Sequence, residues 1–327
     1  MFQGIGLPRF RVTQLIHWMY EKDVLGIDDI TEFSRPLRET LKGLSYIGNL
    51  KILKKTESSD GTAKLLFGLD DGLSVEGVLI PDEYRLTLCV SSQVGCAMGC
   101  RFCLTASMGL TRNLRADEIA GQVTAVRREL QGQAEITNIV LMGMGEPLKN
   151  FGEVTKAIQI ITQYMGISKR RITLSTAGVV PEMQRLYREM PEVNLAISLN
   201  ATTDDVRSTL MPINNKYNID TLLRACHRLP ISPRRRLTIA YVLLKGINDT
   251  PEDARRLIAM LKGLKAKVNL IPFNEYEGAR YEAPGEKAAI EFQQILIARH
   301  ITAFIRKSKG LEIQAACGQL KTTHEQS

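Results

Sequence analysis

The chain has 327 residues, 44% of them hydrophobic, which is enough to bury a large core and excludes global disorder. It contains no apolar run long enough to span a membrane and no N-terminal signal-peptide pattern, so we expect a cytoplasmic protein. The formal net charge of +8 favours a polyanionic partner without specifying which one.

The first 84 residues have the pattern of a small α+β region. Apolar residues recur at helical spacing up to about Tyr46, which predicts two helices. Three short strands are then expected near residues 50–53, 63–67 and 75–80, separated by turns rich in Ser, Asp and Gly. We therefore predict an N-terminal accessory domain over residues 1–84.

From about Arg85 onward, strand patterns alternate with helix patterns. The strands are expected at residues 86–91, 138–142, 171–174, 194–198, 237–243 and 267–271. The helices are expected near residues 115–131, 151–165, 181–190, 218–229, 251–264 and 284–300. Six such units predict an α/β fold, a partial (β/α)6 barrel over residues 85–309. A further strand at Leu311–Gln314 should lead into a cysteine-containing loop in the C-terminal segment, residues 310–327.

Three cysteines lie close together after the first barrel strand. Cys96, Cys100 and Cys103 have the spacing C-x3-C-x2-C. Three thiolates can bind three irons of a [4Fe–4S] cluster, which usually has four cysteine ligands, and leave the fourth iron open. A structural zinc site would need a fourth ligand from elsewhere, so zinc and plain buried thiols are the alternatives. The run resembles the cluster loop of radical S-adenosylmethionine (SAM) enzymes.

A glycine-rich segment, Gly143-Met144-Gly145-Glu146-Pro147, follows the second barrel strand. Its glycines would let backbone carbonyls approach a ligand, and Glu146 could pair with a cationic amino group such as that of SAM. The alternative is a plain tight turn.

Other candidate positions also follow barrel strands. They are Ser175, Ser198, Leu199 and Asn200, and Asn274. Active sites of barrels lie at the C-terminal ends of the strands, so these residues should meet Gly145 and Glu146 at one mouth and bind SAM. Individually, each could equally be a cap or turn residue.

Two further cysteines lie outside the trio. Cys89 precedes Cys96 by seven residues on the first barrel strand, and Cys317 lies among small residues that suit an exposed thiol. A lone cysteine is more often a buried small hydrophobic residue, which is our interpretation of Cys226.

Seven motifs in order then give the chain a family resemblance. They are Trp18-Met19-Tyr20, the segment from Cys89 to Cys96, Gly-Met-Gly-Glu-Pro, Leu-Ser-Thr-Ala-Gly, Leu-Met-Pro-Ile-Asn, Leu-Ile-Pro-Phe-Asn and Ala-Cys-Gly-Gln-Leu. Together they resemble the dual-specificity RNA methyltransferases that methylate C2 of adenine. The resemblance extends from about Phe10 to Leu320.

This resemblance implies a reaction that uses two SAM molecules. One SAM would methylate Cys317, and the second would be cleaved at the cluster to a 5′-deoxyadenosyl radical that takes a hydrogen from the S-methyl group. The carbon radical would add to C2 of adenine, and Glu76 would remove the C2 proton. Cys89 would then attack Cys317, which releases the product and leaves a disulfide. Without the resemblance, Glu76 could be an outward-facing strand carboxylate.

The resemblance also implies partners. The RNA substrates would be an adenosine in the peptidyl-transferase centre of 23S rRNA and the adenosine beside the anticodon in tRNA. A flavodoxin-like donor would supply electrons, and we expect a monomer. Basic residues of the accessory region should contact phosphate; they are Arg9, Arg11, Lys51, Lys54 and Lys55.

Three other functions compete with this one. A sister group methylates C8 of the same rRNA adenosine and confers antibiotic resistance, but it usually has Ala where this chain has Pro147. A radical SAM enzyme with other chemistry would not explain Cys89 and Cys317. A zinc-containing RNA-binding protein is the non-enzymatic alternative.

Overall fold

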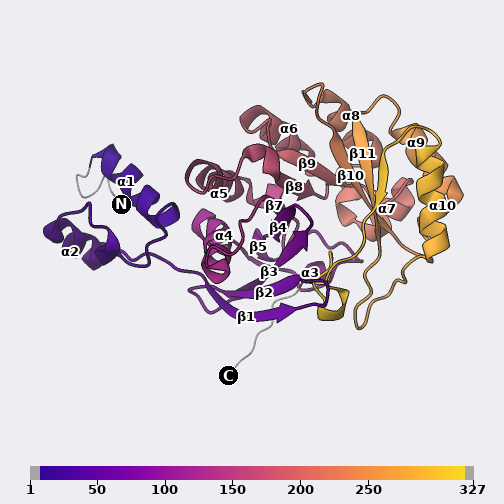
Figure 1. The fold of residues 1–327 in the computed structure, drawn as a ribbon. Coiled ribbons are helices and arrows are strands. Elements are labelled where there is room, and N and C mark those ends of the chain that lie inside the picture. The colour runs from indigo at the N-terminus through magenta and orange to yellow at the C-terminus, as the bar shows by residue number, and fades with distance from the viewer. Residues whose placement is uncertain (1–7, 321–327) are drawn as a thin grey trace.

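Ten strands form one continuous sheet in the computed structural model, which describes residues 8–320 (Figure 1). Their order is β1-β2-β3-β4-β7-β8-β9-β10-β11-β12. All neighbours from β4 to β12 are parallel, whereas β1, β2, β3 and β4 pair antiparallel. The seven parallel strands are β4 (Arg85–Cys89), β7 (Asn138–Leu141), β8 (Ile172–Thr176), β9 (Asn194–Ser198), β10 (Leu237–Leu243), β11 (Ala266–Pro272) and β12 (Ala303–Ile305).

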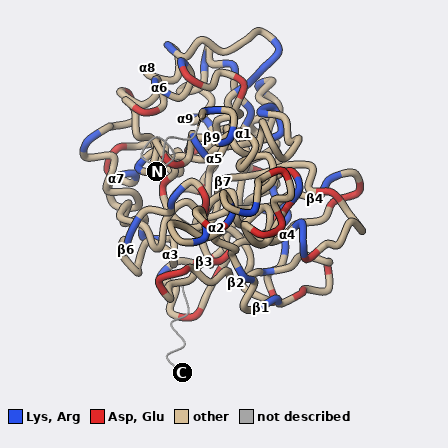
Figure 2. Tube along the Cα trace, turned by 90° about the vertical axis from the view of Figure 1, so that its left-hand side faces the viewer, with Lys and Arg blue, Asp and Glu red and all other residues tan. Residues whose placement is uncertain are grey.

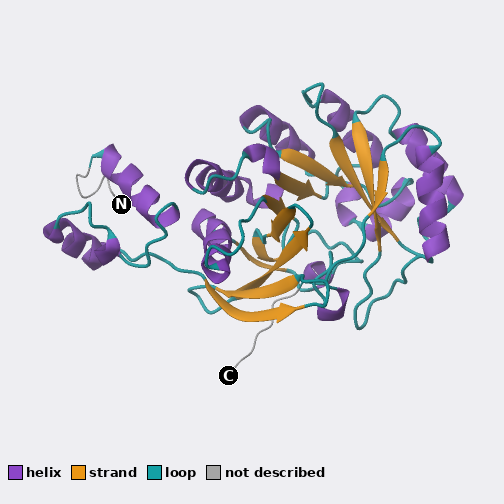
Figure 3. Cartoon of the chain, in the orientation of Figure 1, coloured by secondary structure: helices purple, strands orange, loops and turns teal. Residues whose placement is uncertain are grey.

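The parallel strands are apolar because helices cover them. In β10, six of the seven residues are buried, which is typical of a parallel strand covered on both faces. The helices lie outside the curved sheet (Figure 3). They are α4 (Ala116–Leu130), α5 (Phe151–Tyr164), α6 (Val180–Glu189), α7 (Asp204–Leu210), α8 (Ile219–Arg228), α9 (Pro251–Met260) and α10 (Glu286–Ile297). The expected incomplete α/β barrel is thereby confirmed.

Local sequence signals account for several helix boundaries. Thr250 accepts a hydrogen bond from the Asp253 amide, and the Asp253 carboxylate accepts one from the Thr250 amide, so a reciprocal capping box begins α9. Asn218 similarly caps α8 through the Thr221 amide at 3.0 Å.

The N-terminal region contains two kinds of structure. Helices α1 (Arg9–Tyr20) and α2 (Arg35–Leu44) surround a small separate core that includes Ile30 and Phe33. Strands β1 (Lys51–Glu57), β2 (Ala63–Gly68) and β3 (Ser74–Asp82) instead extend the barrel sheet and share its core. The domain boundary at residue 84 therefore stays a prediction. It lies between β3 and β4, which are neighbouring strands of the same continuous sheet.

The expected strand at Leu311–Gln314 is wrong. Residues Leu311–Ile313 form a short 3-10 helix, η6, flanked by Gly310 and Gln314 with φ values of 62° and 52°. These left-handed conformations are incompatible with an extended strand. The seventh parallel strand is β12, which pairs with β11 earlier in the chain.

Several short elements near the barrel mouth were not predicted. Strands β5 (Gln93–Gly95) and β6 (Leu110–Asn113) form an antiparallel pair that encloses the cysteine loop, and α3 (Leu104–Ser107) lies between them. None of the helices within residues 8–320 has the length and apolar character that crossing a membrane requires.

Candidate functional site

The loop after β7 packs tightly against the segment that follows β4. Ser91 Oγ accepts a hydrogen bond from the Met144 amide at 2.8 Å and donates one to the Glu76 carbonyl at 2.6 Å. A Cβ on Gly143 would lie 2.7 Å from Ser91 Oγ. Gly145 has a φ of 101°, and a Cβ there would lie 2.6 Å from Gln93 Cβ. Both glycines are thus required for packing within the chain.

Glu146 is the buried carboxylate of this loop, with 4% of its surface exposed. Its two oxygens accept hydrogen bonds from the Ala177 amide at 2.6 Å and the Leu148 amide at 3.1 Å. Burial raises the pKa of Glu146 to about 7, and these hydrogen bonds oppose the rise. A carboxyl group balanced near neutrality would be stabilised in its charged form by a cationic ligand group.

The residues expected at the ends of β8 and β9 differ in how accessible their side chains are to a ligand. Ser175 and Ser198 are partly exposed on neighbouring parallel strands. Asn200 is 1% exposed, and its side chain accepts from the Val242 amide at 2.8 Å and donates to Met211 Sδ at 3.2 Å. Leu199 is also buried. The two serines therefore present side chains for a ligand, whereas Asn200 forms contacts within the protein.

Arg207 is a buried residue that the sequence analysis missed. Its side chain is fully buried and donates to the Leu199 carbonyl at 3.0 Å and the Ala177 carbonyl at 2.9 Å. Three more of its hydrogen bonds reach the Ser198 carbonyl, Asn214 Oδ1 and the Tyr217 carbonyl. Burial lowers the pKa of Arg207 to about 10, so it stays charged at neutral pH. It connects the ends of β8 and β9, and no local sequence signal indicated this role.

The cysteine loop is closed by backbone contacts. The Cys96 amide donates to the Gly109 carbonyl at 2.7 Å, and the Cys103 amide donates to the Cys100 carbonyl at 3.1 Å. Gly95 has a φ of 77°, and a Cβ there would lie only 2.0 Å from the Gly109 oxygen. Only glycine fits at this position.

The three thiols of the loop neighbour one another closely enough to affect each other's ionisation. Burial raises the pKa of Cys96 to about 11, with a further contribution from Cys103. Burial also raises the pKa values of Cys100 and Cys103, and both other thiols contribute at Cys100. Within residues 8–320, no three Cys, His, Asp or Glu side chains already form a metal-binding group. Metal binding requires these thiols to release their protons.

The donor set nevertheless fits an iron–sulfur cluster. Three thiols lie on one eight-residue loop, and this loop supplies no fourth cysteine for a closed zinc site of the usual kind. Three thiolates leave one iron of a [4Fe–4S] cluster available to a small ligand.

The Cys317 loop lies directly on the cysteine loop. The Leu104 amide donates to the Gly318 carbonyl at 2.8 Å, and Thr105 Oγ1 donates to the Leu320 carbonyl at 2.6 Å. Surrounding protein raises the pKa of Cys317, and Arg306 opposes the rise, although the residue itself is exposed. A thiol among protein atoms that still reaches solvent suits a group that meets a large substrate.

Asn274 supports this loop. Its Nδ2 donates to the Cys317 carbonyl at 3.1 Å, and its Oδ1 accepts from Ser308 Oγ. Both ends of the amide are thus engaged within the chain, and the expected contact between Asn274 and SAM stays a prediction.

Cys89 and Glu76 lie on adjacent antiparallel strands. Cys89 pairs with Val78, and Glu76 is two residues before Val78, so all three side chains lie on the same face of the sheet. Burial raises the pKa of Cys89, and the nearby charge of Cys317 raises it further. Glu76 is buried, and its Oε1 lies 3.3 Å from Lys64 Nζ. The alternative of an outward-facing carboxylate is therefore wrong.

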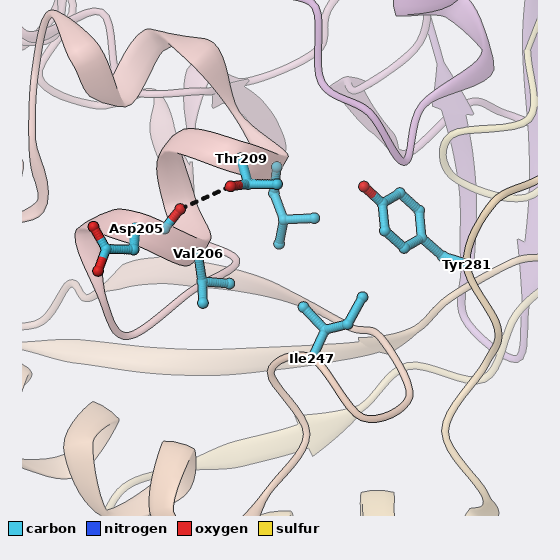
Figure 4. A pocket seen from close by; sticks show the side chains of 6 residues that line it. Asp205, Val206, Thr209, Ile247 and Tyr281 are labelled. Atoms are coloured by element: carbon cyan, nitrogen blue, oxygen red, sulfur yellow. Dashed lines mark hydrogen bonds between the residues drawn. The ribbon is translucent and has the colours of Figure 1, made fainter.

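A cavity of about 240 Å³ lies on another side of the mouth. Figure 4 shows Asp205, Val206 and Thr209 of α7 on one side and Ile247 and Tyr281, which come from later loops, on the other, with the Asp205 carboxylate directed away from Tyr281. The neighbouring residue Leu210 also lines it and accepts a hydrogen bond from the Arg101 amide of the cysteine loop at 2.9 Å. None of the predicted site residues lines this cavity.

Comparisons with known proteins identify relatives of this chain. A family model described as the radical SAM superfamily matches residues 90–258. A second, described as the ribosomal RNA large subunit methyltransferase N-terminal domain, matches residues 1–47.

Curated relatives match nearly the whole chain. A dual-specificity RNA methyltransferase RlmN from Pelobacter propionicus is 52% identical, over 98% of this chain and 91% of the relative. One from Geobacter sulfurreducens is 50% identical, over 97% of this chain and 88% of the relative. The crystal structure of a radical SAM methyltransferase from Sphaerobacter thermophilus has a TM-score of 0.91 at 43% identity, covering 98% of this chain and 95% of that one.

Proposed function

We propose a reaction for this chain from an established premise: it belongs to the radical SAM superfamily and, within it, to the family of dual-specificity RNA methyltransferases. The proposed reaction is methylation of C2 of adenosine. The proposed substrates are an adenosine in the peptidyl-transferase centre of 23S rRNA and the adenosine beside the anticodon in tRNA. The observation that carries the proposal is that the Cys317 loop is hydrogen-bonded directly to the helix that follows Cys103.

The cofactors of this family are a [4Fe–4S] cluster and SAM. Cys96, Cys100 and Cys103 would hold the cluster. When both cofactors are bound, the cluster and SAM together supply a SAM-derived radical after one-electron reduction. An external donor, which we expect to be flavodoxin-like, must provide the electron. Glu146 would bind the amino group of SAM, and Ser175 and Ser198 would donate hydrogen bonds to its other polar groups.

Two thiols and one carboxylate would carry the RNA chemistry. Cys317 would accept a methyl group on sulfur and present it to the base, which its exposed position supports. Glu76 would take the C2 proton, with Lys64 Nζ lying 3.3 Å from its Oε1. Cys89 would then attack the sulfur of Cys317 and release the product as a disulfide forms. The shared sheet face of Glu76 and Cys89 supports their action on one adduct.

Methylation at C2 is favoured over methylation at C8. The curated relatives at about half identity carry the name RlmN and not the name of the C8 group. Pro147, where the C8 group usually has Ala, is buried directly after Glu146 at the start of η3 (Pro147–Asn150).

The accessory region supplies part of the expected RNA contact. Lys51 and Lys54 are exposed on the edge strand β1, along which Figure 2 shows blue, basic segments. Lys55 pairs with Glu57 at 2.8 Å and Glu129 at 3.1 Å, so it is less available to phosphate. We also expect the protein to act as a cytoplasmic monomer.

One experiment tests the reaction, its position and the substrate together. The protein is reconstituted anaerobically and incubated with SAM, a reductant and either 23S rRNA or tRNA, and nucleosides are then analysed by mass spectrometry. The expected product is 2-methyladenosine. The appearance of 8-methyladenosine would instead assign the C8 reaction. Cleavage of SAM without any modified base would contradict the RNA substrates.

A further inference from the structure

A second cavity, of about 340 Å³, lies beside the mouth between α5 and α6 and the segment after η5 (Pro212–Asn215). One wall contains Leu148, whose amide donates to Glu146 Oε1 at 3.1 Å. Another wall of the cavity includes Val179. This residue lies two positions after Ala177, whose amide donates a hydrogen bond to the Glu146 carboxylate. The cavity is therefore adjacent to the proposed SAM site, and its volume is within the range of small-ligand pockets.

The lining of this cavity carries excess positive charge. Lys149, Lys216 and Arg185 are exposed at its edge, and Glu182 is its one lining carboxylate. Arg185 is paired with Glu182 at 3.5 Å and Glu189 at 2.8 Å. Among residues 8–320, neither lysine forms an ion pair. The charge of Lys149 also lowers the pKa of the nearby Glu146, against the rise that burial causes, but neither lysine is tied into an ion pair in the described part of the chain, so both remain available to a negatively charged ligand.

Aromatic rings accompany these cations. Arg185 Cζ lies 4.1 Å from the centre of the Phe151 ring, and Lys216 Nζ lies 5.5 Å from that of Tyr217. Phe151 is itself buried beneath Arg185, so the Arg185 guanidinium and the partly exposed Tyr217 ring are the planar groups on which an unpaired RNA base could stack. An isolated phosphate would not need them, and an acidic protein surface would not need a concave site.

We propose that this basic and aromatic pocket, lined by Lys149, Phe151, Arg185, Lys216 and Tyr217, binds a nucleotide of the RNA strand that flanks the target adenosine. Lys149 and Lys216 contact its phosphates. The proposal rests on the proposed function, because it requires an RNA substrate at the neighbouring mouth. It also adds a contact separate from the accessory region, so the RNA is held on more than one side of the reacting base.

Paired charge-removing variants provide the test. Lys149→Gln with Lys216→Gln removes the two pocket charges. Lys262→Gln with Lys265→Gln removes two exposed charges just before β11, at the opposite end of the barrel. Both variants lower the net charge equally, so only direct contact distinguishes them. Iron content and thermal unfolding confirm that each variant is folded.

Affinity for an RNA fragment that contains the target adenosine is measured against salt concentration. The pocket variant should bind more weakly, and its log–log salt slope should be shallower by about 1.4, or 0.7 for each lost single-strand phosphate contact. The slope of the control variant should remain close to that of the wild type. The same rate of cluster reduction by flavodoxin is expected for both variants.

Three results would overturn the proposal in distinguishable ways. Equal slopes for both variants, with normal wild-type binding, would reject the pocket while leaving the proposed function intact. An unchanged RNA slope with slower reduction by flavodoxin would assign the pocket to an acidic protein. Failure of the wild type to bind RNA at all would reject the pocket and the proposed RNA substrate together.

Discussion

In the barrel wall, many apolar side chains are buried against one another, whereas in the mouth single polar contacts connect distant parts of the chain. In β10, Leu237, Tyr241 and Leu243 are all fully buried, so each is supported by several neighbours. At the mouth, Thr105 donates a hydrogen bond to the carbonyl of Leu320, 215 residues away. The barrel wall is therefore stabilised by many overlapping apolar contacts, whereas the structure of the mouth depends on individual polar groups.

This difference has a functional meaning. Apolar packing tolerates a change of partner, because dispersion and burial are not directional. A hydrogen bond fixes a distance and an angle, so it can hold a reacting thiol in place. Substitutions in the mouth should thus change chemistry or loop geometry more than they change the barrel.

The largest effect is expected from Cys317→Ala. The exposed thiol is removed from the surface of the loop, so methylation of RNA should be abolished. Iron content and reductive SAM cleavage should persist, because none of the three cluster cysteines is changed. Product analysis measures RNA methylation and SAM cleavage, and iron determination measures the cluster content. Methylation at the wild-type rate would remove Cys317 from the reaction.

Cys89→Ala should block the last step only. Without the second thiol, the protein should accumulate covalently attached to RNA through Cys317. Denaturing gels with labelled RNA would reveal the adduct, and the Cys226→Ala variant, which lacks a buried cysteine on α8, serves as the control. Release of free product by Cys89→Ala at the normal rate would contradict its proposed role.

Arg207→Met tests whether one residue joins two strand ends at the mouth. The change leaves several buried acceptors unsatisfied, so the free energy of unfolding should fall by about 3 kcal/mol or more. Arg188→Met on the exposed side of α6 should change it by less than about 0.5 kcal/mol. Denaturant unfolding under anaerobic conditions provides both values. Equal free energies of unfolding for the two variants would mean that Arg207 is not needed to stabilise the mouth beyond the packing of the barrel wall.

Glu146 should make SAM binding and apo stability depend on pH. Its pKa of about 7 lies above the ordinary value of 4.5, so the folded apo protein binds the proton more tightly than the unfolded chain. The stability from this group is complete below pH 4.5 and is lost as the pH rises through about 7. SAM affinity should rise over the same upper range, because the ligand's ammonium group needs the carboxylate. Titration of Glu146→Gln should show neither dependence, and an unchanged pH profile would reject the assignment.

Thr105→Val should have the smallest effect. It removes one buried hydrogen bond to the Leu320 carbonyl at nearly constant volume, at a cost of about 1 kcal/mol. The Cys89–Cys317 disulfide should then form more slowly under mild oxidation, as non-reducing gels would measure. Thr124→Val, which removes a local hydrogen bond within α4, is the matched control. Equal disulfide rates in both variants would show that this contact does not position Cys317.

The barrel wall was largely predictable because its signals are local. The strands at 194–198 and 237–243 coincide with β9 and β10, since β-branched and apolar runs mark them directly. The short strand β12 was missed because its three residues carry too little pattern, and the expected strand after Gly310 failed because of two left-handed residues. These backbone conformations depend on contacts rather than on composition.

The mouth was predictable in its chemistry but not in its contacts. The cysteine motif and Glu146 follow from spacing and from the rule that barrel sites lie at strand ends. The roles of Arg207 and Asn200 could not be predicted, because a polar residue in a loop gives no sign of burial until its distant acceptors are known. Asn274 likewise supports the Cys317 backbone through a contact 43 residues away.

The antiparallel pairing of β3 with β4 has a consequence for insertions and deletions. Glu76 and Cys89 share a face only because the strands keep the register in which Val78 lies opposite Cys89. Side chains alternate along a strand, so gaining or losing one residue between Glu76 and Val78 would move the carboxylate to the other face. A length change there should be as harmful as removing the carboxylate itself.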